Sequence, residues 1–181
     1  MTEVPQPRPE RMVPFAGHPA VVGIEPGQSE LVVLAAVDWA LAVGASALHF
    51  AYVDPDRVVV AEGRDGSVRH EGLEPDAADD GWRDTEADLR ARLAALLDPT
   101  GVRWAFHYLA GRPDRALTHL ARAVDASVFI VGARHPGAAR RIAELFAGSL
   151  AAHLAQHQHR PVLTIPIAVV DWADPSDEWA K

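Results

Sequence analysis

The chain has 181 residues, of which 49% are apolar, and this length suits one compact α/β domain better than two. Its formal net charge of −8 argues against a general binder of nucleic acid or of anionic membranes. The lack of cysteine excludes disulfides and thiolate chemistry. No apolar run reaches the length of a membrane span, and the N-terminus lacks the features of a signal peptide. We therefore expect a cytoplasmic protein.

Apolar runs alternate with segments of helical spacing along most of the chain, which is typical of strands joined by helices. Residues 1–18 are rich in proline, which predicts a flexible N-terminal lead-in. A single domain is expected at 19–168, followed by an acidic tail at 169–181. The pattern predicts strands at 19–25, 47–53, 102–109, 126–132 and 161–167, and helices at 30–43, 82–97, 115–124 and 138–158. Gly148 interrupts the last helix pattern, so a break there is as plausible as a continuous rod.

These elements predict an α/β fold with three layers and a doubly wound, parallel, five-stranded sheet. The strand at 102–109 alternates apolar and polar residues and is expected to be a half-buried edge strand. Pro161 and Pro166 each remove a ladder donor from the last strand, which is therefore expected at an edge or against a partner chain. Residues 56–80 interrupt the alternation of strands and helices, and the Asp65-Gly66 pair within them predicts a hairpin in a surface insertion.

The strongest functional signal is a short buried strand, a glycine-containing loop and a helix, which together run from Ala126 to Gly148-Ser149. This geometry turns backbone N–H groups and a helix N-terminus towards an anion and predicts a ligand that carries phosphate. Ligands of doubly wound sheets bind outside the carboxyl ends of the strands, where the winding reverses. The first and fourth strands border that crevice, and their ends carry Ile24-Glu25 and Gly132.

Several segments of the chain, in this order, resemble the universal stress protein family: Val22 to Glu25, Leu48 to Val53, Leu109 to Pro113, Ile130 to Gly132, Gly148-Ser149 and Arg160 to Leu163. The resemblance implies a flavodoxin-like sheet of order 3-2-1-4-5 and a homodimer, often paired through the last strand, here Pro161 to Ile167. It also implies ATP binding in some members and none in others. Mg²⁺ is expected only together with ATP.

Nucleotide-binding members carry a glycine, two residues, a second glycine, nine residues and then Gly-Ser or Gly-Thr. Gly132 fits the first position, His135 replaces the second glycine, and Gly148-Ser149 fits the last pair three residues late. Glu25 takes the place of the usual aspartate. The candidate contacts to a cofactor are Ile24, Glu25, Val53, Gly132, Arg134, Gly137, Gly148 and Ser149. The plainer interpretation is that these glycines are turn residues and that Arg134, with Arg140 and Arg141, lies on a solvated face.

His153 and His157 stand four apart on a helix, but no carboxylate or cysteine nearby completes a metal site, and histidines at a helix C-terminus also suit its dipole. We therefore predict no metal site and no catalytic residue. Two functions fit the sequence: a homodimeric stress-response module that binds an adenine nucleotide, or a dimeric interaction scaffold that has lost the nucleotide. Slow ATP hydrolysis is a third, weaker hypothesis, because no general base can be named.

Overall fold

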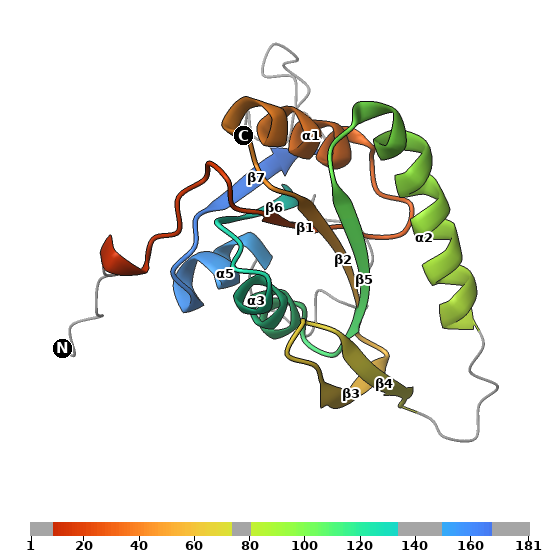
Figure 1. Ribbon diagram of the computed structural model, residues 1–181. Helices are drawn as coiled ribbons and strands as arrows, with labels where there is room; N and C mark the ends of the chain where they lie inside the picture. Colours follow the sequence, from red (N-terminus) through yellow and green to blue (C-terminus); the bar gives the residue numbers. More distant parts are fainter. Residues whose placement is uncertain (1–8, 74–80, 134–149, 168–181) are drawn as a thin grey trace, which may run out of the picture.

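The computed structural model describes residues 9–73, 81–133 and 150–167, which form a layered α/β fold (Figure 1). The elements in chain order are η1 (Pro9–Arg11), β1 (Ala20–Gly23), α1 (Leu31–Val43), β2 (Leu48–Asp54), β3 (Arg57–Glu62), β4 (Val68–Gly72), α2 (Gly81–Leu97), η2 (Asp98–Thr100), β5 (Trp104–Ala110), α3 (Pro113–Ala123), β6 (Val128–Ala133), α5 (Leu150–His157) and β7 (Val162–Pro166). The predicted strands and helices that fall in the described ranges are present, with slightly shifted ends.

Five parallel strands form the main sheet in the order β5-β2-β1-β6-β7. When only these strands are numbered along the chain, the order is the 3-2-1-4-5 that the resemblance implied. β1 lies at the centre, with Val21 opposite His49 of β2 on one side and opposite Phe129 of β6 on the other. All of β1 is buried, as expected for a strand covered on both faces. β5 and β7 form the two edges, which confirms the predicted place of the alternating strand and of the strand with two prolines.

Two apolar clusters hold the helices on opposite faces of the sheet and so complete the three predicted layers (Figure 1). α1 and α2 pack on one face, where Phe50 of β2 is fully buried. α3 and α5 pack on the other face, where Phe129 of β6 is fully buried. Each such side chain contributes about 1.5–3 kcal/mol relative to an exposed one. None of the helices in the described ranges is long and apolar enough to cross a membrane.

β3 and β4 form a separate antiparallel hairpin, which confirms the hairpin predicted from the Asp-Gly pair. Gly66 at its tip has a φ of +83°, a conformation that favours glycine. The tip rests on α3, because a Cβ on Gly66 would lie 2.7 Å from Leu120 Cδ1 and 3.2 Å from Ala123 Cβ. The hairpin is thus packed against the domain at its tip.

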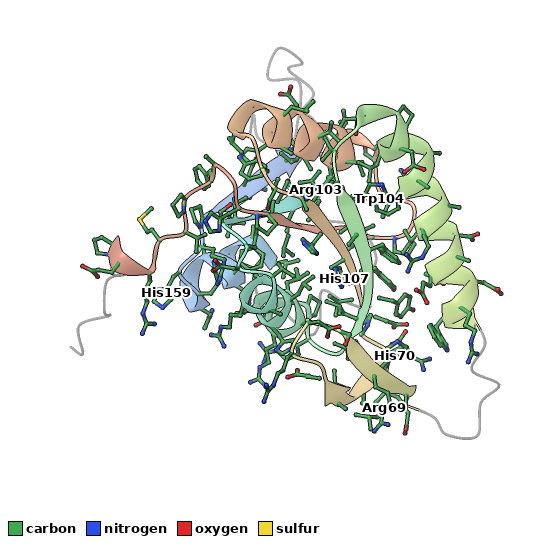
Figure 2. All side chains as sticks on the ribbon, viewed as in Figure 1. Arg69, His70, Arg103, Trp104, His107 and His159 are labelled. Atoms are coloured by element: carbon green, nitrogen blue, oxygen red, sulfur yellow. The ribbon has the colours of Figure 1, made fainter. Side chains whose placement is uncertain are left out.

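The other end of the hairpin is fastened by aromatic and charged side chains. The Nε of Arg57, a residue only 5% exposed, donates a hydrogen bond of 2.6 Å to His70 Nδ1. The Arg57 guanidinium also lies 5.2 Å from the ring centre of Trp82 at the start of α2. Figure 2 shows His70 where β4 meets the end of β5, and its ring lies 5.4 Å from that of Tyr108. The hairpin is therefore joined to both β5 and α2.

The segment before β1 runs along the amino ends of the strands. Phe15 packs edge-on against Trp39 of α1, with ring centres 5.9 Å apart. α1 ends at Gly44, which has a φ of +65° and was predicted as the end of this helix. Glu30 holds the N-cap position of α1 without a side-chain capping bond. Ser29 Oγ, one residue earlier, accepts a hydrogen bond from the Leu31 N–H, at 3.3 Å.

Candidate functional site

The predicted crevice lies between the carboxyl ends of β1 and β6, the two central strands. Gly23 of β1 is opposite Val131 of β6, so Ile24 and Gly132 follow as neighbours at the end of this pair. Ile24 is 7% exposed and its N–H donates to the Ala51 carbonyl of β2 over 3.0 Å. Glu25, the next residue, is exposed. The chain leaves β1 towards β2 on one side and leaves β6 towards β7 on the other, which is the switch point where ligands bind in such sheets.

Gly132 is a glycine because there is no room for a side chain on that face of β6. A Cβ at this position would lie 3.2 Å from Val32 Cγ2 and 3.2 Å from Ile167 Cγ2, and it would collide with Gln28 Nε2. Val32 belongs to the first turn of α1, so Gly132 faces the N-terminus of that helix. The helix start predicted for the anion site, after the loop that follows Gly132, lies outside the described residues. The helix start that Gly132 faces belongs to α1, and its free N–H groups also suit an anion.

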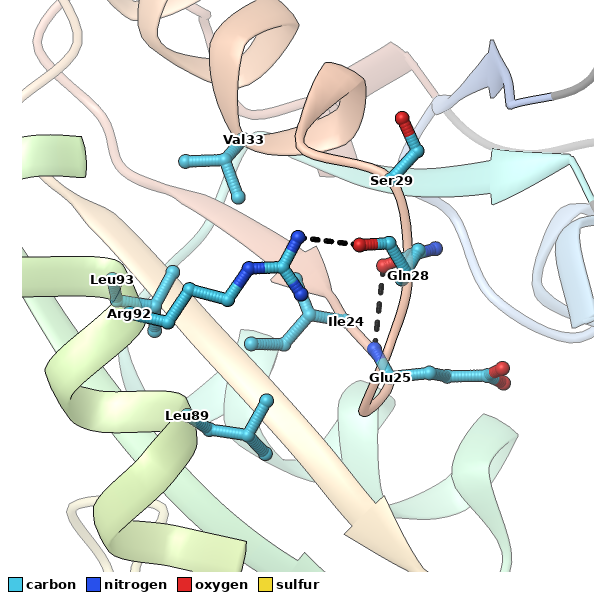
Figure 3. A pocket seen from close by; sticks show the side chains of 8 residues that line it. All are labelled: Ile24, Glu25, Gln28, Ser29, Val33, Leu89, Arg92 and Leu93. Atoms are coloured by element: carbon cyan, nitrogen blue, oxygen red, sulfur yellow. Dashed lines mark hydrogen bonds between the residues drawn. The ribbon is translucent and has the colours of Figure 1, made fainter. Parts of the chain in front are cut away.

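The loop between β1 and α1 closes over this space and is held from two sides (Figure 3). Gln28 Oε1 accepts a hydrogen bond of 3.2 Å from the Glu25 N–H within the loop. Arg92 reaches across from α2 and donates to the main-chain carbonyl of Gln28. In Figure 3 the carboxylate of Glu25 points away from Arg92 and out of the pocket.

A small pocket remains beneath this loop, between α1 and α2. It is lined by Ile24, Glu25, Gln28, Ser29, Val33, Leu89, Arg92 and Leu93. The cavity measures about 10 Å³, which is roughly the space that one water molecule needs. A second hollow of about 200 Å³ lies between the same loop and α2, and is lined by Pro26, Gly27, Thr85, Asp88, Leu89 and Arg92.

Carboxylates gather on the β2 side of the same edge. The hydroxyl of Tyr108 donates a hydrogen bond of 2.6 Å to Asp54 Oδ2, and burial together with this bond raises the pKa of Tyr108. Burial also raises the pKa of Tyr52 to about 12, with further contributions from Asp54, Glu25 and Asp56. Both phenols stay protonated at neutral pH. The negative charge around them disfavours an anionic group on the β2 side of this edge.

The structure brings only some of the predicted ligand residues together. Ile24, Glu25 and Gly132 meet at the crevice, as expected. Val53 lies near the end of β2, but its side chain is 8% exposed and packs in the apolar cluster with α3, on the opposite face from Ile24. Arg134, Gly137, Gly148 and Ser149 lie outside the described residues, as do Arg140 and Arg141.

The histidine pair on α5 has a structural explanation within the described residues. His157 Nδ1 lies 2.9 Å from the His153 carbonyl, and the two rings are stacked with centres 5.7 Å apart. In the ranges that the structure describes, no group of three His, Asp or Glu side chains is arranged to hold a metal ion.

Two residues of the crevice were missed from the sequence. Gln28 lies between the predicted strand at 19–25 and the predicted helix at 30–43, and Arg92 lies within the predicted helix at 82–97, and neither was among the candidate contacts. Arg92 is 64 residues from the carbonyl it contacts, so only the packing of α2 beside the loop reveals it. The position of Gln28 just before the start of a helix was the one feature of the sequence that could have indicated its role. That feature becomes informative only once the fold shows that the helix start faces Gly132.

Comparison with known proteins agrees with this geometry. The sequence profile described as the universal stress protein family matches residues 18–166. The universal stress protein UspA from Lactobacillus plantarum has a TM-score of 0.59 to this chain at 18% identity, over 83% of this chain and 98% of that one. A search of curated proteins finds no match.

Two further solved structures similar to this chain contain nucleotides. The universal stress protein from Archaeoglobus fulgidus in complex with dAMP has a TM-score of 0.53 at 18% identity, over 82% of this chain and 97% of that one. A universal stress protein in complex with cAMP has a TM-score of 0.56 at 23% identity, over 84% of this chain and 99% of that one. Likeness at these identities establishes the fold, and the profile match over most of the chain establishes the family. This chain belongs to the universal stress protein family.

Proposed function

We propose that the protein is a cytoplasmic, homodimeric stress-response module that binds an adenine nucleotide at the carboxyl ends of β1 and β6. The observation that carries the proposal is the position of Gly132, which faces the first turn of α1 beside the end of β1. The structures of family members with dAMP and with cAMP support an adenine nucleotide as the ligand. The cysteine-free composition fits a reducing compartment.

Each described residue of the crevice has a role in this proposal. Ile24 supplies an apolar floor, and the exposed carboxylate of Glu25 accepts hydrogen bonds from the ribose hydroxyls or the adenine amino group. The phosphates lie towards Gly132, away from the carboxylates of β2. Arg134, Gly137, Gly148 and Ser149 follow β6 along the chain, and we propose that they contact the phosphates, with Mg²⁺ bound only when the ligand is ATP. Val53 is proposed to contribute its backbone alone, because its side chain faces the other layer.

The proposed output is a change in protein contacts that follows binding. A nucleotide that contacts residues 134–149 would favour one of the surfaces that the protein can present to partners and so shift the population towards it. We propose that the homodimer forms through β7, which is an edge strand with Leu163 36% exposed. Binding, and not catalysis, is the proposed activity.

A nucleotide-free scaffold is the second candidate, and one observation favours it. The cavity beneath the loop is about 10 Å³, and Gln28 lies where a ligand near Gly132 would go. A scaffold would keep the β7 edge for pairing and leave the crevice closed.

Thermal unfolding with and without nucleotide separates the two candidates. AMP, ADP and Mg-ATP at millimolar concentration should raise the Tm, since a ligand at 100 times its Kd stabilises the folded state by about 2.7 kcal/mol. GTP at the same concentration is the control for base identity, and Glu25→Ala should reduce the shift. An unchanged Tm with all three adenine nucleotides would favour the scaffold.

A further inference from the structure

The side chain of Gln28 occupies the space that the proposed function assigns to a nucleotide. Its Nε2 would collide with a Cβ on Gly132, and its Oε1 accepts the hydrogen bond of the Glu25 N–H. The amide therefore bridges the ends of β1 and β6 in the way that a polar group of a ligand would. Figure 3 shows Gln28 between Glu25 and the start of α1.

The loop that carries Gln28 is held in this closed position by a second contact. Arg92 of α2 donates to the Gln28 carbonyl, and the cavity that remains beside it is about 10 Å³. A purine ring does not fit in that cavity, whereas a second hollow of about 200 Å³ lies between Pro26-Gly27 of the loop and α2. A ligand group that contacts Gly132 on this face of β6 must displace the Gln28 amide, which its flexible side chain allows without any change in the strands.

We propose that Gln28 is an internal competitor of the nucleotide, so that the crevice exists in a closed form with the amide inside and an open form with the amide displaced. This inference rests on the proposed function. The closed form lowers the apparent affinity by the fraction of molecules that are open. Because the amide makes one neutral hydrogen bond and one packing contact at the site, its removal should tighten nucleotide binding by roughly two- to tenfold.

The position of the amide also indicates which part of the ligand displaces it. Gln28 Nε2 lies against Gly132, on the side away from the carboxylates near β2, so it lies where the phosphates are proposed to go. The competition should therefore be stronger for a ligand with phosphates, such as AMP, than for adenosine.

Calorimetric titration with AMP and with adenosine tests the inference on the wild-type protein, Gln28→Ala and Leu34→Ala. Leu34 is 50% exposed on α1, the helix that follows the loop of Gln28, and provides a control close in sequence that does not contact Gly132. We expect Gln28→Ala to bind AMP two- to tenfold more tightly, with a smaller gain for adenosine and no gain for Leu34→Ala. Gln28→Ser serves as a second variant if the alanine variant folds poorly.

Each result decides the question. AMP binding that is detected only in Gln28→Ala would support the inference in its strongest form. Equal or weaker binding by Gln28→Ala, with normal binding by the wild type, would overturn it and leave the proposed function standing. No binding by any of the proteins would overturn the proposed function and the competition together.

Discussion

Two neighbouring histidines on β2 and β5 make the stability of the fold depend on pH in a predictable direction. His49 Nδ1 and His107 Nε2 lie 3.0 Å apart, so one ring nitrogen donates a hydrogen bond and the other accepts it. Burial lowers the pKa of His49. Burial, assisted by His49 and Arg90 and opposed by Asp65, lowers the pKa of His107 to about 4. His107 lies along β5 in Figure 2.

The lowered pKa fixes the sign of the effect. A histidine in the unfolded chain has a pKa of about 6.5, so from there down to pH 4 the unfolded state binds a proton that the folded state excludes. The free energy of unfolding is therefore greatest above that window and falls as the pH decreases through it. For His107 the loss between neutral pH and pH 5 is about 1–2 kcal/mol after allowance for its partial exposure. His49 acts in the same direction.

Urea unfolding at pH 7, 6 and 5 measures this loss. His107→Gln should lose at least about 1 kcal/mol less than the wild-type protein over that range. His157→Gln, at an exposed position of α5, should keep the wild-type dependence. An equal loss in wild type and His107→Gln would show that burial does not exclude the proton, and the reasoning would be wrong.

Three further predictions follow from the packing. Gly66→Ala should destabilise the protein by about 2–3 kcal/mol in urea unfolding, because it adds backbone strain and a collision with α3. Gly101→Ala, at a φ of +71° with open space around it, should cost only about 1 kcal/mol. Equal losses of stability in the two variants would show that the hairpin tip does not pack on α3. Tyr108→Phe removes the hydrogen bond to a carboxylate of β2 and should destabilise by about 1–2 kcal/mol in the same assay, and a stable variant would count against that bond. Leu163→Lys should raise the Kd of the proposed dimer at least about tenfold, as measured by light scattering after gel filtration. Leu41→Lys, on α1 and 62% exposed, should leave that Kd unchanged. A dimer that survives Leu163→Lys would exclude β7 as its interface.

The strand order and the three layers were predictable because apolar periodicity and family resemblance act together in this chain. β1 and β6 are continuous apolar runs, and such runs predict central strands. Pro161 and Pro166 predicted an edge position for the last strand because proline has no N–H to donate to a neighbouring strand, a reason that does not depend on the rest of the fold. The hairpin of β3 and β4 followed from a turn dipeptide with a clear backbone preference.

The crevice was predictable in its strand ends and not in what covers it. Ile24, Glu25 and Gly132 follow from the rule that ligands bind where the winding reverses. The side chain of Gln28 and the reach of Arg92 depend on the distance between α2 and the loop after β1, which no local pattern encodes. Val53 was a candidate contact, and the alternation of β2 places its side chain on the opposite face of the sheet from Ile24, a detail that depends on the exact register of the strand.

The most direct test of nucleotide binding at this edge is a ¹H–¹⁵N spectrum of the protein titrated with AMP. The amide signals of Ile24, Glu25 and Gly132 should shift together and saturate with one Kd, while those of β3 and α5 stay in place. No shift at millimolar AMP, or shifts confined to residues away from the ends of β1 and β6, would contradict the account.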